Sequence, residues 1–186
     1  MSSVIINNLK GIEKCSYLEL GVHNNKNFNA INAREKQSVD MNGRAIFTGT
    51  TDEYFDQLDS SVKFDIIFID ANHDYDFVLR DFNNSVDRST KWILLHDMIP
   101  PTVEYTSTEK CSDSYKILYF LLKETNFEIY PMNNNYGFTL IKVPVTKINP
   151  DESYKNVPYD EFMNYIKDIK LYSDAEIVEM LGAENV

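Results

Sequence analysis

Glycine is scarce in this sequence, with 6 residues in a chain of 186. A dinucleotide-binding fingerprint needs three glycines at fixed spacing, for a tight turn, for close approach of the backbone to phosphate and for helix packing. Counting from Gly21, the other two places hold His23 and Lys26. The scarcity therefore argues against a nicotinamide-dependent oxidoreductase, although Asn24 or Asn25 can adopt the positive φ that glycine would otherwise supply.

Basic residues are also few. The 18 lysines and arginines face 29 aspartates and glutamates, which leaves a formal net charge of -11. Such a surface repels a phosphate backbone or an anionic membrane, so we expect neither nucleic acid nor a membrane as a partner. The 2 cysteines, Cys15 and Cys111, make no disulfide framework. Because free thiols are commonest in reducing compartments, we expect a cytoplasmic protein.

Long apolar runs are missing too. None approaches the roughly 18 residues that a membrane span needs, and the short apolar run near the start follows no basic segment, so we expect no signal peptide. The sequence instead alternates short apolar runs with longer amphipathic stretches. Seven runs have the length of a strand: 17–21, 37–41, 45–49, 64–70, 92–97, 127–132 and 136–143.

The order of these runs predicts the fold class. The runs 64–70 and 92–97 are apolar without alternation, as in strands covered on both faces of a parallel sheet. Residues 75–86 place Leu79 and Phe82 at helical spacing between them, and 112–124 repeats the pattern further on. Strand, helix and strand in repeated order predict a doubly wound α/β sheet, whose ligand crevice lies beyond the carboxyl ends of the strands.

The end of the chain predicts a hairpin and a tail. The last two strand-length runs are separated by three asparagines, 133–135, which tolerate left-handed turns, so an antiparallel hairpin is expected at one edge. We assign residues 1–148 to one α/β domain. The polar, proline-punctuated segment 149–186 is predicted to hold two short helices, 159–169 and 173–182, as an appendage of that domain. We expect it to clasp its own domain, with self-association into a homodimer as the alternative.

Two segments suit a nucleoside. Asp40 lies about 20 residues after Gly21, the distance at which an acid commonly binds a ribose diol, and an ordinary strand-end turn explains it equally well. The segment 47–55 leads into a short helix, for which Thr51 or Asp52 is the expected N-cap. Neither segment identifies a ligand by itself.

Two acids carry more information. Asp70 and Asp97 end neighbouring central runs, where buried carboxylates must be paired, hydrogen-bonded or neutralised by a cation. A hard dication such as Mg²⁺ suits two carboxylates with water and substrate oxygens. Alternatively, His73 or His96 could serve as a general base, because an imidazole has an unperturbed pKa near 6.5.

Three motifs, taken in order, resemble a known family: LELGV at 18–22, IFIDANHDYD at 67–76 and LLHDMIPP at 94–101. They are similar to the E-x-G, IFIDGxHxYE and vlHDxxP motifs of class I S-adenosylmethionine-dependent methyltransferases, in particular the small-molecule O-methyltransferase-like branch. The resemblance covers about residues 15 to 145, and the ordered combination is more specific than any single motif.

The resemblance implies a Rossmann-like, mostly parallel seven-stranded sheet with an antiparallel last strand and helices on both faces. It also implies S-adenosyl-L-methionine as the cofactor. Glu19 and Gly21 would face its methionine part and Asp40 its ribose hydroxyls, while Thr51 and Asp52 would lie near adenine. The full set of expected cofactor-binding residues is Glu19, Gly21, Asp40, Gly49, Thr51, Asp52 and Asp70.

For the reaction, the resemblance implies methylation of a hydroxyl on a small molecule or glycan. Asp70 would lie beside the methyl donor, and Asp70, His73 and His96 are the expected catalytic residues. In metal-dependent relatives, acids that match Asp70 and Asp97 bind a divalent ion, so we expect Asp70, His96 and Asp97 to hold Mg²⁺ or Mn²⁺. We favour this ion over a histidine base as the means of activating the hydroxyl.

Several departures from the family motifs leave a second function open. Met98 stands where catechol-type relatives have an amide ligand, Ala71 replaces a frequent glycine, and the first loop keeps only Gly21. The alternative hypothesis is therefore a catalytically degenerate protein that retains the fold as a binding or partner module.

Overall fold

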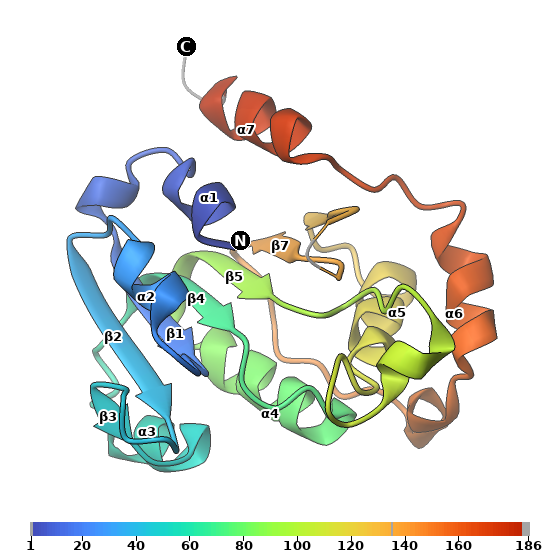
Figure 1. Ribbon diagram of the computed structural model, residues 1–186, viewed down its shortest axis with the longest axis horizontal. Coiled ribbons are helices and arrows are strands. Elements are labelled where there is room, and N and C mark those ends of the chain that lie inside the picture. The colour runs from blue at the N-terminus through green and yellow to red at the C-terminus, as the bar shows by residue number, and fades with distance from the viewer. Residues whose placement is uncertain (1, 135, 184–186) are drawn as a thin grey trace.

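The computed structural model describes residues 2–134 and 136–183. Its centre is a 7-stranded sheet of order β3-β2-β1-β4-β5-β7-β6 (Figure 1). The strands are β1 (Ser16–Leu20), β2 (Glu35–Asp40), β3 (Phe47–Thr48), β4 (Phe64–Ile69), β5 (Ser89–Leu95), β6 (Ile129–Pro131) and β7 (Thr139–Lys142). β7 pairs antiparallel with both β5 and β6, whereas the other pairings are parallel. The predicted doubly wound sheet with an antiparallel last strand is confirmed.

Helices cover both faces of the sheet (Figure 1). They are α1 (Ser2–Asn7), α2 (Lys26–Ala30), α3 (Thr51–Gln57), α4 (Tyr75–Val86), α5 (Tyr115–Glu124), α6 (Tyr159–Ile166) and α7 (Asp174–Ala183). Short 3₁₀ turns lie at Ile12–Lys14, Val103–Thr106 and Glu152–Asn156. Among the described residues, no helix is both long and apolar enough to cross a membrane.

The central strand β4 shows why its apolar run does not alternate. Ile67 and Ile69 join the core on the side of α4, α5 and α6, while Ile66 and Phe68 join the core on the side of α1, α2 and α7. Because both faces of β4 are covered, each residue of the run is buried in one core or the other. The run ends at the carboxyl edge of the sheet, where the chain continues to Asp70.

Helix α1 was not predicted. It is only six residues long, too short for a periodic pattern to stand out, and helices of this length depend on packing for stability. Ile5 and Ile6 supply that packing, since they are 2% and 0% exposed and belong to the same core as Phe28 of α2.

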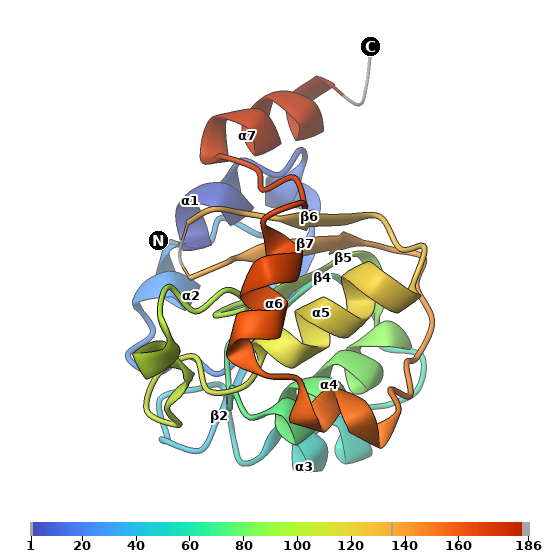
Figure 2. The ribbon, with the colours of Figure 1, turned by 90° about the vertical axis from the view of Figure 1, so that its right-hand side faces the viewer.

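The tail lies against the sheet domain. Figure 2 shows α6 alongside α5, where the fully buried ring of Phe162 lies 5.1 Å from that of Tyr115. α7 contacts α1, and its Ile177 is 1% exposed. These contacts agree with an intramolecular clasp.

The buried contacts of the tail predict that it unfolds together with the rest of the domain. Phe162→Ala should lower the free energy of unfolding by about 3 to 5 kcal/mol, because it removes a buried ring from the core. Val178→Ala, on the exposed side of α7, should change it by less than about 0.5 kcal/mol. Urea denaturation followed by circular dichroism measures both. An unchanged midpoint for Phe162→Ala would mean that the tail unfolds apart from residues 1–148.

Candidate active site

A cavity of about 1080 Å³ opens at the carboxyl edge of the sheet. It is large enough for a nucleoside cofactor together with a small acceptor. It is lined by every residue predicted for the cofactor, the reaction or the metal: Glu19, Gly21, Asp40, Gly49, Thr51, Asp52, Asp70, His73, His96 and Asp97. The structure brings these residues together, and their individual roles remain predictions.

Gly21 lies where the end of β1 meets the end of β4, beside Asp70. Its φ is 84°, and a Cβ atom on it would lie 2.1 Å from the carbonyl oxygen of Asp70. The Gly21 amide donates to the Val39 carbonyl at 2.8 Å, and the Asp70 amide donates to the Leu20 carbonyl at 2.8 Å. Only glycine fits between the ends of these strands, which explains why this one glycine is present in an otherwise glycine-poor loop.

The loop after β1 takes its shape from asparagine, histidine and aspartate. His23 and Asn25 have φ of 46° and 61°, so Asn25 does adopt the left-handed conformation expected of it. Asp40 Oδ2 accepts from the Val22 and His23 amides at 2.9 Å each, and Asp40 Oδ1 accepts from the Asn42 amide at 2.9 Å. A carboxylate oxygen can accept more than one hydrogen bond, so a ribose contact by Asp40 stays a prediction.

Glu19 lies buried in the cavity wall at 1% exposure. Its Oε2 atom accepts from the Tyr17 hydroxyl at 2.6 Å and from Asn27 Nδ2 at 3.1 Å. Burial raises the pKa of Glu19 to about 7, against the lowering effect of these two donors. Tyr17 was not predicted as part of the site, although side chains two residues apart on a strand share a face.

The raised pKa of Glu19 predicts a pH-dependent stability. Its folded pKa exceeds its unfolded value, so its contribution is complete below pH 4.5 and is lost as the pH rises through about 7. The Gln side chain of Glu19→Gln is uncharged at every pH. The free energy of unfolding of this variant should therefore be about 2 to 4 kcal/mol higher than that of the parent at pH 8, with little difference near pH 4. Denaturation of the cofactor-free protein at both pH values checks this.

The exposed Glu13→Gln is the control and should shift stability by less than about 0.5 kcal/mol at either pH. Equal stability of Glu19→Gln and the parent at pH 8 would show that Glu19 is not destabilised by burial.

The predicted N-cap of α3 is wrong by one residue. Thr50, and not Thr51 or Asp52, caps the helix: its Oγ1 accepts from the Glu53 amide at 3.2 Å, and Glu53 Oε2 accepts from the Thr50 amide at 2.8 Å. Because this reciprocal capping box satisfies the helix end, Thr51 and Asp52 are free to line the cavity.

The far wall of the cavity combines ionic and apolar side chains. Asp52 pairs with Arg80 Nε at 2.9 Å, and burial raises the pKa of Asp81 to about 6. Met41 and Phe77 remain 75% and 41% exposed and line the same hollow. Large apolar side chains left open in a cavity mark a place for an apolar or planar ligand. The sequence analysis missed Asp81, which lies on the buried side of α4.

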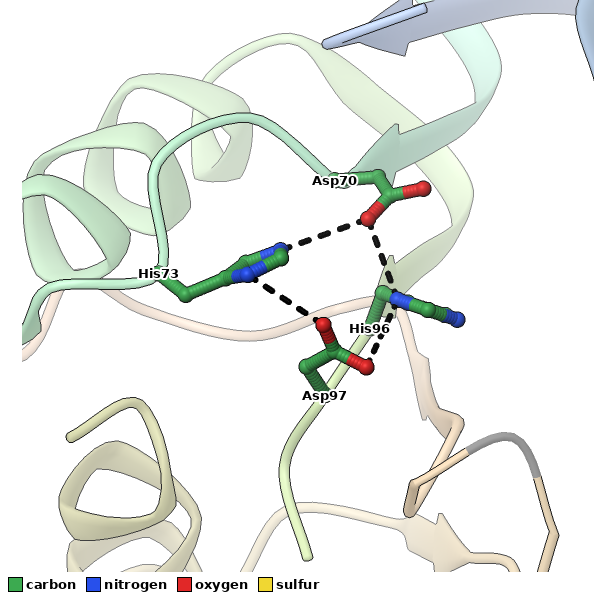
Figure 3. Close-up of side chains that lie close together, drawn as sticks. All are labelled: Asp70, His73, His96 and Asp97. Atoms are coloured by element: carbon green, nitrogen blue, oxygen red, sulfur yellow. Dashed lines mark hydrogen bonds and ion pairs between the residues drawn. The ribbon is translucent and has the colours of Figure 1, made fainter. Parts of the chain in front are cut away.

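Four side chains from the ends of β4 and β5 form a closed cluster (Figure 3). Asp70 Oδ1 lies 3.3 Å from His73 Nε2 and 3.0 Å from His96 Nδ1. The oxygens of Asp97 lie 3.2 Å from His73 Nδ1 and 3.0 Å from His96 Nδ1. The two predicted carboxylates thus meet, and both predicted histidines lie between them.

The opposite charges in this cluster shift its pKa values. Burial alone would raise the pKa of the Asp70 carboxyl, but hydrogen bonds and charges of His73 and His96 outweigh burial and hold it below its usual range. Burial would lower the pKa of the His96 imidazole, but Asp70 and Asp97 raise it to about 10. The pKa of His73 is raised as well, against burial, by Asp70 and Asp97.

The donor set also fits a metal ion. One donor atom from each of Asp70, His73, His96 and Asp97 lies within 4.8 Å of the others. His96 Nδ1 and Asp97 Oδ1 are buried and have no hydrogen-bond partner among the described residues, although they lie 3.0 Å apart. Met98 is 1% exposed and packs into the core, so it offers this cluster no ligand.

The backbone at Asp97 is strained. Its φ is 59°, a conformation that costs a residue with a side chain about 1 to 2 kcal/mol. The buried Ser114 hydroxyl donates to the Asp97 carbonyl at 2.6 Å and helps to fix the turn. Strain of this kind is typical of functional sites.

An aromatic pair that was not predicted from the sequence also borders the cavity. The rings of Tyr105 and Tyr136 lie 5.3 Å apart, and Tyr136 is 46% exposed and lines the cavity. Lys110 Nζ lies 4.1 Å from the Tyr105 ring centre, and the Lys110 carbonyl lies 2.9 Å from His73 Nδ1. An acceptor entering here would meet aromatic and cationic groups next to the cluster.

Comparisons with known proteins agree with this fold. A family model described as a methyltransferase domain matches residues 10–98. No curated protein sequence matches the chain. The O-methyltransferase TomG from Streptomyces achromogenes, involved in tomaymycin synthesis and solved with SAM, has a TM-score of 0.59 at 12% identity, over 76% of this chain and 79% of that one.

Two further solved structures share the fold. An O-methyltransferase from Bacillus cereus in complex with SAH has a TM-score of 0.54 at 12% identity, over 76% of this chain and 78% of that one. The SAH-bound methyltransferase PaMTH1 from Podospora anserina has a TM-score of 0.54 at 16% identity, over 70% and 72%. Sequence identities this low establish only a shared fold. The family model adds a match to a methyltransferase domain. The family model thus identifies a methyltransferase domain over residues 10–98, and the solved methyltransferases show that the chain shares their fold.

Proposed function

We propose that this methyltransferase transfers the methyl group of S-adenosyl-L-methionine to a hydroxyl oxygen of a small molecule or sugar. The observation that carries the proposal is the single cavity that joins Gly21 and Asp40, on the cofactor side, to the cluster around Asp70. The O-methyltransferases that share the fold support the choice of oxygen as the acceptor atom.

The residues of the cavity suit the steps of such a transfer. The sulfonium carbon–sulfur bond breaks as the oxygen–carbon bond forms, the electron pair stays on sulfur, and the hydroxyl proton must leave. Tyr136 and Lys110 would orient the acceptor, while Asp70, between His73 and His96, would hold its hydroxyl. Apolar walls at Met41 and Phe77 would exclude water from the nucleoside.

Two routes for the hydroxyl proton are compatible with the cluster. In the first, an imidazole nitrogen of His73 or His96 accepts it as a general base, after the ring has lost the proton that Asp70 and Asp97 stabilise on it. Alternatively, a divalent ion held by Asp70, His96 and Asp97 would supply positive charge that lowers the pKa of the hydroxyl. Both routes place the acceptor oxygen at the same cluster, so the proposed reaction does not depend on which is used.

Thermal denaturation with S-adenosylhomocysteine, with NAD and without ligand tests the cofactor. At about 100 times its dissociation constant, S-adenosylhomocysteine should add about 2.7 kcal/mol of stability, and NAD should add none. Each arm is run with and without Mg²⁺ and Mn²⁺. A shift with NAD alone would contradict the proposal.

The alternative function is a fold that binds but does not transfer. The single observation in its favour is the glycine-poor first loop. Incubation with S-adenosylmethionine and a panel of phenols, sugars and aliphatic alcohols separates the two, since only the enzyme releases S-adenosylhomocysteine in step with a methylated product. Binding of S-adenosylhomocysteine without turnover on any class of hydroxyl would favour the binding module.

A further inference from the structure

The cluster of Asp70, His73, His96 and Asp97 carries an inference about which ion it takes. We infer that these four side chains form a mixed nitrogen and oxygen site that binds a transition-metal dication, with Zn²⁺ tightest, Mn²⁺ weaker and Mg²⁺ weakest. The inference deepens the proposed function, on which its catalytic meaning rests. It adds His73 to the expected ligands and favours Zn²⁺ where Mg²⁺ or Mn²⁺ was expected.

The chemistry of the donors sets the preference. Two imidazoles and two carboxylates face one another in the cluster. Mg²⁺ prefers oxygen ligands in near-octahedral geometry and keeps much of its water, whereas imidazole nitrogen suits zinc, iron and related metals. For one set of nitrogen and oxygen ligands, Zn²⁺ binds more tightly than Mn²⁺. A site in which half of the donors are nitrogens should therefore discriminate against Mg²⁺.

The spacing of the donors supports a compact coordination shell. Around a tetrahedral ion with bonds of about 2.0 to 2.2 Å, neighbouring donor atoms stand about 3.4 Å apart. Asp70 Oδ1 lies 3.3 Å from His73 Nε2 and 3.0 Å from His96 Nδ1. His96 Nδ1 lies 3.0 Å from Asp97 Oδ1. These distances require only small outward movements to admit an ion.

His73 has the orientation of a metal ligand. Its Nδ1 lies 2.9 Å from the Lys110 carbonyl oxygen, which can only accept, so Nδ1 carries the hydrogen. Nε2 faces Asp70 Oδ1, 3.3 Å away. Because these two atoms repel unless a proton or a metal ion lies between them, a bound ion would take the place of the proton there. Metal-binding histidines commonly donate their second ring N–H to a backbone carbonyl in this way.

Two buried atoms give an independent reason for an ion. Asp97 is 8% exposed. Its Oδ1 atom and the Nδ1 atom of His96 make no well-oriented hydrogen bond among the described residues, although they lie 3.0 Å apart as an ion pair. Buried polar atoms are nearly always satisfied in native proteins. One cation between them would satisfy both atoms, and it would balance the charge of Asp70 as well.

The position of Met98 explains why a second histidine is needed. Its side chain packs into the core at 1% exposure, so the residue directly after Asp97 contributes no ligand. His73 reaches the same place from the loop after β4, three residues beyond Asp70. With both imidazoles coordinated, neither keeps a lone pair for a proton, so activation of the hydroxyl would fall to the ion.

Direct binding to the full chain tests the inference without any turnover. The chelator-treated, cofactor-free protein is titrated with Zn²⁺, Mn²⁺ and Mg²⁺ by calorimetry, and with Co²⁺ by visible absorption, which reports nitrogen and oxygen ligation in a small coordination shell. The expected order of affinity is Zn²⁺ above Mn²⁺ above Mg²⁺. Mg²⁺ binding as tight as that of Zn²⁺ would overturn the inference.

Histidine variants locate the site. His73→Asn and His96→Asn should each weaken Zn²⁺ binding by about 100-fold, since loss of an outer-shell partner alone costs about 10- to 100-fold. The remaining one of the 3 histidines, His23, lies on the cofactor side of the cavity, and His23→Asn should leave Zn²⁺ affinity unchanged. Equal Zn²⁺ affinity of the parent and both cluster variants would also overturn the inference.

Binding of S-adenosylhomocysteine, measured on the same samples, shows that each variant is folded and separates the two proposals. Retained S-adenosylhomocysteine binding with no ion bound would leave the proposed function standing and make the cluster two imidazolium–carboxylate pairs. Tight Zn²⁺ binding with no affinity for S-adenosylhomocysteine would uphold the metal site and contradict the proposed function.

Discussion

Replacing Gly21 with alanine is expected to lower the free energy of unfolding by more than about 4 kcal/mol, which is exceptional for one substitution. The loss comes from a steric clash with backbone atoms as well as from the unfavourable positive φ. The new Cβ atom would lie 2.1 Å from the carbonyl oxygen of Asp70 and 2.6 Å from the Cα atom of Ala71. The end of β4 would have to move away from β1. Urea denaturation followed by circular dichroism measures the loss.

Gly43 provides a matched control. Its φ is 70°, close to the 84° of Gly21, but a Cβ atom on it would meet nothing within 4 Å. Gly43→Ala should therefore cost only the conformational penalty, about 1 to 2 kcal/mol. Equal costs for the two substitutions would show that the approach of Gly21 to Asp70 can relax without loss.

Asp70→Asn is expected to reduce kcat/KM for methyl transfer by about 100- to 10,000-fold, the range attributed to positioned acid–base groups. The amide would keep the shape of the side chain but lose the charge that faces His73 and His96. Because the proposed role of Asp70 is beside the methyl group, which S-adenosylhomocysteine lacks, binding of S-adenosylhomocysteine should change much less. Steady-state kinetics and calorimetry on the same preparation separate the two effects.

Asp65→Asn is the control, since it makes the same change on β4, the strand that leads to Asp70. Asp65 accepts from the Ser16 amide at 2.9 Å and pairs with Lys91 at 3.2 Å, away from the cavity. It should affect stability and leave kcat/KM near the parent value. Parent-like turnover in Asp70→Asn would place the reaction outside the Asp–His cluster.

The sequence predicted the parts of this molecule that follow from short-range patterns. Apolar runs of strand length gave the sheet, and parallel strands place their carboxyl ends at one edge, so Asp70 and Asp97 were expected to meet there. The motif resemblance added the cofactor-side residues. The N-cap was missed by one residue, because Thr50, Thr51 and Asp52 are all good caps and the reciprocal contact with Glu53 decides among them.

Contacts between distant segments were not predictable. The Lys110 carbonyl lies 37 positions from His73, and it is a backbone atom, which any residue type could supply. The pairing of Tyr105 with Tyr136 depends on how the segment after β5 packs against the β6–β7 hairpin. Whether the two histidines bind protons or an ion depends on distances of a few tenths of an ångström, which no sequence pattern carries.

The contacts of Asp40 affect how the cofactor would bind. Because this carboxylate already accepts hydrogen bonds from the amides of Val22 and His23, the loop that would border the nucleoside is held in place by the protein's own hydrogen bonds. A preordered loop loses little conformational entropy on association. The cofactor should therefore bind without a conformational change of this loop. We expect fast, single-phase binding kinetics and almost no change in the hydrogen exchange of these amides.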